Sequence, residues 1–312
     1  MLFAIFTNNA FSQQTNSTED YSAYLPELRA FNQRLANEMI MPDSAAKTQL
    51  QPAVKYIQGQ SGKLALRIFK PDTIRAIVMD IHGGGWLGGI AAFDDKLNDE
   101  MARTCKVVVV SVEYRLASPE SPFPACVNDC KAAASWLVNN SLKEFGTDNI
   151  FISGSSVGGH LAALTTLYIR DSLHAIDKIK GVNLAYGCFD ISRTPSNIMA
   201  TNSTFVLNKQ VLDFVWNTVF HEWSIEQTRN PQYSPMYADL KNLPPALFTI
   251  GTADPLIDDS YFMEARWRLA GNKTFLAVYP ECPHAFNAFP TKIAQAANGK
   301  MYQWIISLCN KQ

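Results

Sequence analysis

Short apolar blocks recur along the chain and predict strands separated by helices. Seven runs rich in aliphatic residues fit strands, at 63–69, 75–81, 106–112, 149–154, 181–187, 246–251 and 274–280. Several of these runs are continuously apolar rather than alternating, notably Val107 to Val110. Continuous runs are typical of strands that are buried on both faces, as in a parallel sheet.

The segments between these runs repeat apolar residues every three or four positions, as helices do. In 124–140, Cys126, Cys130 and Leu137 share one stripe, and Pro124 suits a first helical turn. Four further segments have a helical pattern: 94–105, 157–171, 258–271 and 292–308. This alternation predicts an α/β fold with a doubly wound, mostly parallel sheet of about eight strands.

One long segment, residues 190–240, breaks the alternation. It contains no clear strand, and its helix-like centre, Val211 to Trp223, lies between Pro195 and Pro231. A long irregular insertion in a regular α/β chain usually lies over a site, so we expect a helical cap here. The alternative is a surface excursion without a role at a site.

The N-terminal part of the chain has two components. Residues 20–41 form an amphipathic helical pattern, and we expect this segment, to about residue 45, to complete the cap of a single domain covering 20–312. Residues 1–19 begin with a short apolar stretch, and Ala10-Phe11-Ser12 has the small-x-small form of a signal cleavage site, but a positive leading region is missing. A signal remnant and a disordered terminus are the two alternatives. The compartment, cytoplasmic or exported, therefore stays open.

The composition is that of a globular protein and argues against two kinds of partner. Of the 312 residues, 47% are hydrophobic and 18% are charged, which is enough to bury a large core. The formal net charge is -1 and no basic stripe is present, so we expect no nucleic-acid partner. No apolar run reaches the length of about 18 residues that a membrane span needs. We expect a monomer or a homodimer.

Six cysteines are scattered through apolar segments: Cys105, Cys126, Cys130, Cys188, Cys282 and Cys309. In a chain of this length, such a distribution favours buried thiols over a disulfide framework. Cys126 and Cys130 lie one helical turn apart but have no further cysteine or histidine at metal-ligand spacing, so we predict no metal site.

The stretch Gly154-Ser155-Ser156-Val157-Gly158 fits the pattern G-x-S-x-G. It follows a predicted strand and precedes a predicted helix, which is the setting in which this pattern holds a nucleophilic serine on a tight turn. The pattern selects Ser156, because Ser155 lacks the flanking glycines. For this stretch alone, a glycine-rich turn without catalysis is the alternative.

A serine hydroxyl needs a base to become a nucleophile. Five histidines are candidates: His82, His160, His174, His221 and His284. His284 follows the last predicted strand, and loops at the carboxyl ends of parallel strands build the active sites of such sheets. Asp254 follows the preceding predicted strand and is the best acid to orient the histidine, with Asp258 as the runner-up. His160, one turn along the helix from Ser156, is interpreted as a structural residue.

The motif HGGGW consists of His82, Gly83, Gly84, Gly85 and Trp86 and follows a predicted strand. Consecutive glycines let backbone N–H groups turn toward a ligand without obstruction by Cβ atoms, as an oxyanion hole requires. We expect the N–H groups of Gly83 and Gly84 to act together with that of Val157. A phosphate-binding loop is not supported, because neither G-x-x-x-x-G-K nor G-x-G-x-x-G follows the first strands.

These motifs, in this order, resemble the hormone-sensitive-lipase-like branch of the α/β-hydrolases, whose members carry HGGG. The resemblance runs from about Tyr24 to the C-terminus and includes 114-YRLASPE-120, 123-FPA-125, 234-SPMYADLKNLPPAL-247, 254-DPLID-258 and 284-HAF-286. It implies an α/β-hydrolase fold with a cap, and a serine carboxylesterase that acts on short- to medium-chain acyl esters without a metal or cofactor. It also implies that Ser156 is the nucleophile, Asp254 the acid and His284 the base.

Three residues depart from the family's pattern near this site. Ser155 stands where the family usually has an acidic residue or threonine, Val157 replaces the usual alanine, and Ser118 is an extra residue in the usual YRLAPE run. These changes bear on substrate range and rate rather than on the mechanism. Two alternative functions stay open: an amidase or arylformamidase of the same fold, and a non-catalytic ligand-binding relative.

Overall fold

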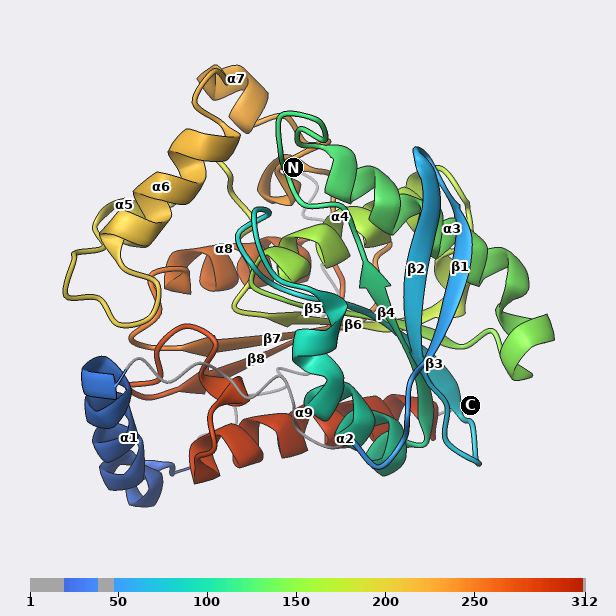
Figure 1. The fold of residues 1–312 in the computed structure, drawn as a ribbon, viewed down its shortest axis with the longest axis horizontal. Coiled ribbons are helices and arrows are strands. Elements are labelled where there is room, and N and C mark those ends of the chain that lie inside the picture. The colour runs from blue at the N-terminus through green and yellow to red at the C-terminus, as the bar shows by residue number, and fades with distance from the viewer. Residues whose placement is uncertain (1–19, 39–47, 311–312) are drawn as a thin grey trace, which may run out of the picture.

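Eight strands form one sheet in the computed structural model, which describes residues 20–38 and 48–310 (Figure 1). The strands are β1 (Ala53–Gly59), β2 (Gly62–Phe69), β3 (Ala76–Ile81), β4 (Val107–Glu113), β5 (Ile150–Ser155), β6 (Ile179–Ala185), β7 (Ala246–Gly251) and β8 (Thr274–Tyr279). They lie in the order β1-β2-β4-β3-β5-β6-β7-β8. Strand β2 is antiparallel to both of its neighbours, and the remaining pairs of this sheet are parallel. The predicted doubly wound, mostly parallel sheet is confirmed, whereas the expectations on residues 1–19 and 39–45 fall outside the described residues.

The seven predicted strands all form, but strand β1 was not among them. It is an edge strand, with β2 as its neighbour in the sheet. Its side chains are largely in solvent: Val54 is 52% exposed and Tyr56 is 63% exposed, whereas Ile57 is buried. Because apolar residues stand on its exposed face, β1 lacks the buried apolar pattern by which the central strands are recognised.

Helices cover both faces of the sheet (Figure 1). One face carries α3 (Ala125–Phe145), α4 (Val157–Asp171) and α8 (Ile257–Leu269), and the other carries α2 (Asp95–Cys105) and α9 (Lys292–Cys309). Helix α1 (Leu25–Glu38) packs against α9. Short 3-10 helices lie at η1 (Ser22–Tyr24), η2 (Ala91–Asp94), η3 (Ile176–Lys178) and η5 (Phe286–Ala288). The predicted helices therefore form, and α3 runs five residues past the predicted end at 140, to Phe145, where Gly146 ends it in the left-handed conformation.

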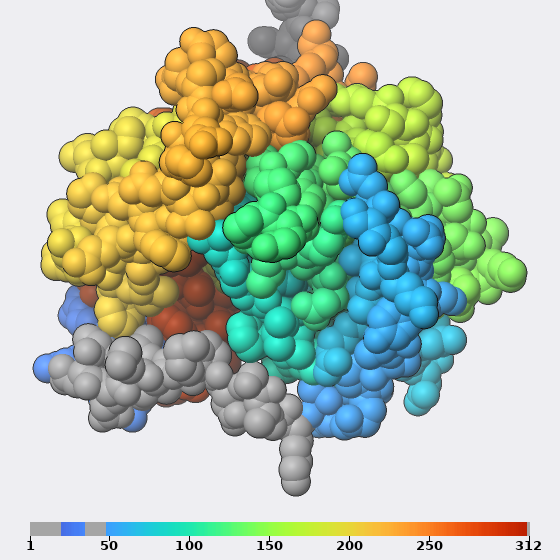
Figure 2. Space-filling model, turned by 45° about the horizontal axis from the view of Figure 1, so that its top comes forward, coloured from blue at the N-terminus to red at the C-terminus, as the bar shows by residue number. Residues whose placement is uncertain are grey.

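The insertion at 190–240 gathers at one end of the molecule (Figures 1 and 2) and forms short helices (Figure 1). These are α5 (Pro195–Ile198), α6 (Lys209–Val219), α7 (Ile225–Thr228) and η4 (Pro235–Tyr237). Helix α6 begins two residues before the predicted centre because the Asn208 side chain accepts a hydrogen bond from the N–H of Val211. The helix ends four residues before Trp223, and the chain then turns so that Phe220 and Trp223 contact each other at 5.3 Å between ring centroids.

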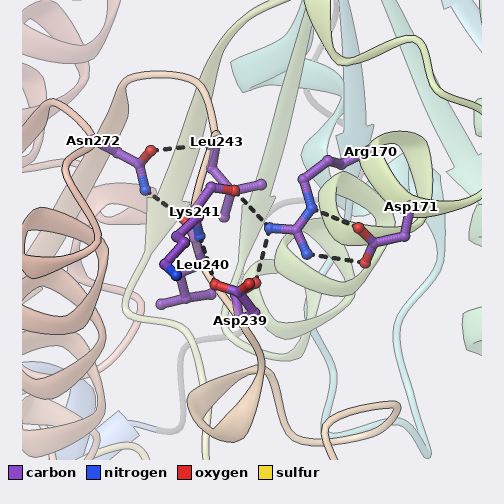
Figure 3. A network of polar contacts seen from close by, with 7 residues as sticks. All are labelled: Arg170, Asp171, Asp239, Leu240, Lys241, Leu243 and Asn272. Atoms are coloured by element: carbon purple, nitrogen blue, oxygen red, sulfur yellow. Dashed lines mark hydrogen bonds and ion pairs between the residues drawn. The ribbon is translucent and has the colours of Figure 1, made fainter.

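A polar network fixes the chain where the insertion returns to β7 (Figure 3). Arg170, at the end of α4, donates from Nη1 to the carbonyls of Asp239 and Lys241 at 2.8 and 2.7 Å, and its Nε and Nη2 bind the carboxylate of Asp171. Asn272 accepts from the N–H of Leu243 at 2.9 Å. Side chains thereby satisfy backbone groups at the end of the insertion, which anchors this end to α4 and to the loop before β8.

All six cysteines are free thiols, and five of them are buried. Burial raises the pKa of the Cys105 and Cys126 thiols to about 12, so they stay protonated and act as small hydrophobic side chains. In the part of the chain that the structure describes, no helix combines the length and apolar character that crossing a membrane requires.

Candidate active site

Four loops at the carboxyl ends of parallel strands meet at one edge of the sheet. HGGGW follows β3, Ser156 follows β5, Asp254 follows β7 and His284 follows β8. The parallel register pairs Ile81 at the end of β3 with Gly154 near the end of β5, so HGGGW and the serine turn are neighbours. Candidate residues that are up to 202 positions apart in the sequence, His82 and His284, therefore line one site.

Ser156 sits on a strained turn between β5 and α4. Its backbone has φ 57° and ψ -124°, a conformation that residues with a Cβ rarely adopt. The turn fits against β3 because residue 158 is glycine: a Cβ there would lie 1.9 Å from the carbonyl oxygen of Ile81. The G-x-S-x-G pattern thus has a direct physical cause, since the turn that exposes Ser156 requires close backbone contact.

Three side chains form a continuous chain of hydrogen bonds. His284 Nε2 lies 2.8 Å from Ser156 Oγ, and His284 Nδ1 lies 2.8 Å from Asp254 Oδ2. Asp254 is 2% exposed and its other oxygen accepts from the N–H of Leu256 at 2.8 Å. An ionised carboxylate only accepts hydrogen bonds, so Nδ1 carries the proton and Nε2 is free to accept the proton of the serine.

The structure also shows where other candidates for the acid and the base lie. Asp258 accepts from the N–H of Ser196 in the insertion at 2.8 Å, rather than approaching His284. His174 is exposed, and His221 is exposed in the insertion beside Glu222. Asp254 and His284 are therefore the acid and histidine that geometry brings to Ser156.

The HGGGW loop lies directly beside the serine. A Cβ on Gly83 would stand 3.2 Å from the Cβ of Ser156. The Tyr114 hydroxyl holds the loop by donating to the carbonyl of His82 at 2.9 Å, and the two rings stack at 4.1 Å. Burial lowers the pKa of His82 to about 4, so this histidine is neutral and supports the loop, with Nδ1–H donating to the Gly83 carbonyl.

Three backbone N–H groups beside Ser156 have no acceptor in the described part of the chain. They belong to Gly83, Gly84 and Val157. Val157 is the first residue of α4 and is 3% exposed, so its N–H is buried at the positive end of a helix. Of the three residues, Val157 is buried, Gly83 is half-buried and Gly84 is exposed. A buried N–H group is rarely left unpaired, so the N–H of Val157 is a donor for an oxygen bound in the cavity. Gly84 has φ 129°, a backbone conformation that glycine adopts readily because it has no Cβ.

A cavity of about 430 Å³ opens onto the serine, and its walls differ in character. Residues of the insertion form an apolar wall: Val206, Leu207, Val211, Leu212, Val215 and Trp216. A polar wall is formed by residues of strands β3, β5 and β6 and of helices η2, α2 and η5: Asp80, Asp94, Asn98, Ser155, Asn183 and Asn287. None of the cavity residues comes from the described residues 20–38, so the predicted contribution of the N-terminal helix is not seen at this cavity.

An aromatic cluster joins HGGGW to the insertion. Trp86 is fully buried and meets Trp216 and Phe220 edge to face, at 5.5 and 5.1 Å between centroids. His160 is fully buried as well: Nδ1 accepts from Trp86 Nε1 at 3.3 Å, and Nε2 donates to the carbonyl of Tyr233 at 2.6 Å. The interpretation of His160 as structural fits this placement, and the contact to the insertion is an addition that the sequence did not indicate.

Sequence reasoning missed two residues at the site. Tyr186 packs edge-on against the His284 ring at 4.9 Å and donates to Asn287 Oδ1 at 2.5 Å. Its φ of 37° marks a strained loop after β6. Asp94 lines the cavity but lies in a stretch with an ordinary helix-start pattern. The end of β6, a strand beside β5, was the available signal for Tyr186.

No group of three or more His, Cys, Asp or Glu side chains within the described ranges is arranged to hold a metal ion. The arrangement instead provides a serine hydroxyl, a base in contact with it, an acid behind the base and unpaired N–H groups nearby. These are the parts that nucleophilic attack on a carbonyl carbon requires.

A family model described as alpha/beta hydrolase fold matches residues 78–288, and the chain belongs to this family. The arylesterase of Saccharolobus solfataricus is 32% identical to it over 234 residues, which cover 73% of this chain and 74% of the relative. Carboxylesterase NlhH of Mycobacterium tuberculosis is 30% identical over 247 residues, which cover 75% of this chain and 74% of the relative.

Solved structures agree with the sequence relatives. A hyperthermophilic esterase from the archaeon Pyrobaculum calidifontis has a TM-score of 0.77 and 28% identity, and the match covers 93% of this chain and 94% of that one. The family match and the esterase relatives confirm the resemblance that the motifs indicated.

Proposed function

We propose that the protein is a serine carboxylesterase that hydrolyses short- to medium-chain acyl esters. The observation that carries this proposal is the hydrogen-bonded chain Asp254–His284–Ser156, which ends in the cavity beside three unpaired N–H groups. The similarity to proteins named arylesterase and carboxylesterase supports an ester as the substrate.

In this proposal each residue of the site has one role in the reaction. Ser156 Oγ attacks the ester carbonyl carbon while its proton passes to His284 Nε2, 2.8 Å away. The carbonyl oxygen becomes an oxyanion and accepts hydrogen bonds from the N–H groups of Gly83, Gly84 and Val157. One such donor is typically worth about 2.7–4 kcal/mol of transition-state stabilisation.

Collapse of this intermediate breaks the bond to the alcohol, which leaves with the proton from His284. Water then attacks the acyl-serine, giving its proton to His284, and the carboxylic acid departs as the proton returns to Ser156 Oγ. Asp254 keeps the His284 ring in the required tautomer and stabilises its positive charge at each stage.

The insertion acts in this proposal as a cap that supplies the apolar side of the substrate site. Val215 approaches the HGGGW loop so closely that a Cβ on Gly85 would lie 3.1 Å from it. An apolar wall beside the HGGGW loop suits an acyl or alcohol chain, because burying such a chain contributes about 0.8 kcal/mol per methylene.

The experiment compares p-nitrophenyl butyrate hydrolysis by the wild type, Ser156→Ala and the matched neighbour Ser155→Ala. We expect Ser156→Ala to lower kcat by at least about 10³-fold and Ser155→Ala by less than about tenfold. Near-full activity of Ser156→Ala refutes the nucleophile assignment. The corresponding p-nitroanilide, assayed in parallel, separates an esterase from an amidase.

A further inference from the structure

The polar wall of the cavity has an excess of negative and acceptor groups. Two carboxylates line it, those of Asp80 and Asp94, and no lysine or arginine is among the described residues that line this cavity. The two carboxylates differ in their surroundings. Asp80 Oδ2 accepts from Asn98 Nδ2 and from Ser111 Oγ, both at 2.8 Å.

Asp94 has no such partners. It occupies the N-cap position of α2, where an aspartate usually accepts an N–H of the first turn, but its side chain makes no capping bond. It has no side-chain hydrogen bond or ion pair with any described residue, whereas its neighbour Asp95 is bound by Arg67. A half-buried carboxylate that faces a cavity without a donor is a group that a ligand can satisfy.

A second acceptor on the same wall is independent of the carboxylates. Asn183 is 4% exposed, and its Nδ2 donates to Ser153 Oγ at 3.1 Å and contacts Met301 Sδ at 3.0 Å. Its Oδ1 has no hydrogen-bond partner in the described part of the chain. Buried side-chain acceptors are rarely left unpaired, so Asn183 adds a second acceptor without a donor to the residues that line this cavity.

The acidic side chains of the polar wall favour a hydrogen-bond donor that carries a positive charge. Burial, together with the nearby charges of Asp80 and Asp95, raises the pKa of Asp94 to about 8. A raised carboxyl pKa means that negative charge at this position is unfavourable without a counter-charge. A cation in the cavity removes that penalty, and an ammonium group adds three N–H donors to match the unpaired acceptors.

We propose that the polar wall is a subsite for a protonated amine, so that the preferred substrates are esters carrying an ammonium group. This inference rests on the proposed esterase function and names its substrate class. Asp94 is the specificity-determining residue, Asp80 adds to the negative field, and the apolar wall holds the connecting methylenes.

Three p-nitrophenyl esters of equal length provide the test: 6-aminohexanoate, 6-hydroxyhexanoate and heptanoate. They end in ammonium, hydroxyl and methyl, so that charge, hydrogen bonding and chain length are separated. The alcohol side is tested in the same way with 6-aminohexyl acetate and heptyl acetate. Assays at pH 8.5 and low salt, rather than at neutral pH, favour the ionised form of Asp94, whose pKa burial raises, and keep the amine protonated. Ser156→Ala gives the background rate.

We expect the wild type to prefer ammonium over methyl by at least about tenfold in kcat/KM in one of the two series. Asp94→Asn should reduce this ratio by at least about tenfold, because it removes the charge and keeps the shape. Asp177→Asn is the matched control: it removes one carboxylate from the exposed surface of η3 and should leave the ratio unchanged.

Three outcomes overturn the proposal: equal rates on ammonium and methyl esters in both series, a preference confined to the acyl series that the hydroxyl ester shares equally, or an unchanged ratio in Asp94→Asn. The proposed function is judged separately. Hydrolysis of the heptanoate by the wild type, abolished in Ser156→Ala, supports the esterase even if the amine subsite fails, whereas its absence refutes the esterase itself.

Discussion

Replacement of His160 by phenylalanine tests how HGGGW is joined to the insertion. The substitution keeps an aromatic ring, though a larger one, and two buried groups lose their partners: Trp86 Nε1–H and the carbonyl of Tyr233. An orphaned buried group costs about 1–3 kcal/mol, so we expect His160→Phe to lower the free energy of unfolding by about 2–6 kcal/mol at pH 7.5. Urea titration followed by tryptophan fluorescence measures this difference.

The same variant carries a pH signature. Burial lowers the pKa of His160 to about 4, below the value of about 6.5 for an unfolded chain. Between pH 6.5 and pH 4 the unfolded state binds a proton on His160 that the folded state does not bind. The stability that depends on neutral His160 is therefore fully present above pH 6.5 and is lost as the pH falls toward 4. The loss amounts to about 3 kcal/mol in the wild type and is missing in His160→Phe.

The stability difference between wild type and variant should therefore shrink from pH 7.5 to pH 4.5. His82, whose pKa is also lowered to about 4, is present in both proteins and cancels. His221→Phe is the control, because its side chain is 62% exposed and such surface changes stay within about 0.5 kcal/mol. A loss below about 0.5 kcal/mol in His160→Phe, or a difference that does not shrink at low pH, would refute the reasoning.

Three further predictions concern the site and the core. Asp254→Asn should lower kcat on p-nitrophenyl butyrate by about 10³–10⁴-fold, because an amide stabilises the wrong histidine tautomer. Asp258→Asn should lower it by less than about tenfold; comparable losses would contradict the choice of acid. Gly158→Ala should destabilise the fold by at least about 3 kcal/mol or prevent folding, since its Cβ would lie 1.9 Å from the Ile81 carbonyl oxygen. Wild-type stability of this variant in a thermal melt would show that the turn can accommodate a Cβ. Native thiols should react slowly with a disulfide reagent and rapidly in urea, because five of the six are buried; fast native labelling of more than one thiol would disprove this.

The sequence predicted the central fold because its signals are local. Buried parallel strands such as β3 and β7, in which every residue is buried, leave continuous apolar runs. Strand β1 lacked this signal because its apolar residues, such as Tyr56, are exposed. Its position in the sheet is set by antiparallel pairing with β2. Pairing between strands depends on register in space, which no short window of the sequence records.

The candidate site was predictable to the extent that its residues follow strand ends. Ser156, Asp254 and His284 each follow a strand directly or by a few residues, so topology alone brings them together. Asp94 and His160 could not be assigned in this way. Each looks like an ordinary helix residue in sequence, and their contacts with the cavity and with Tyr233 depend on tertiary packing.

Covalent labelling by diethyl p-nitrophenyl phosphate tests the central claim most directly. This organophosphate phosphorylates an activated serine and releases p-nitrophenol, so intact-mass and peptide measurements reveal which hydroxyl is the nucleophile. The account predicts one adduct per chain, on Ser156, with esterase activity lost in proportion to labelling and no adduct in Ser156→Ala. An adduct on Ser155 or elsewhere, or full esterase activity in a completely labelled protein, would contradict it.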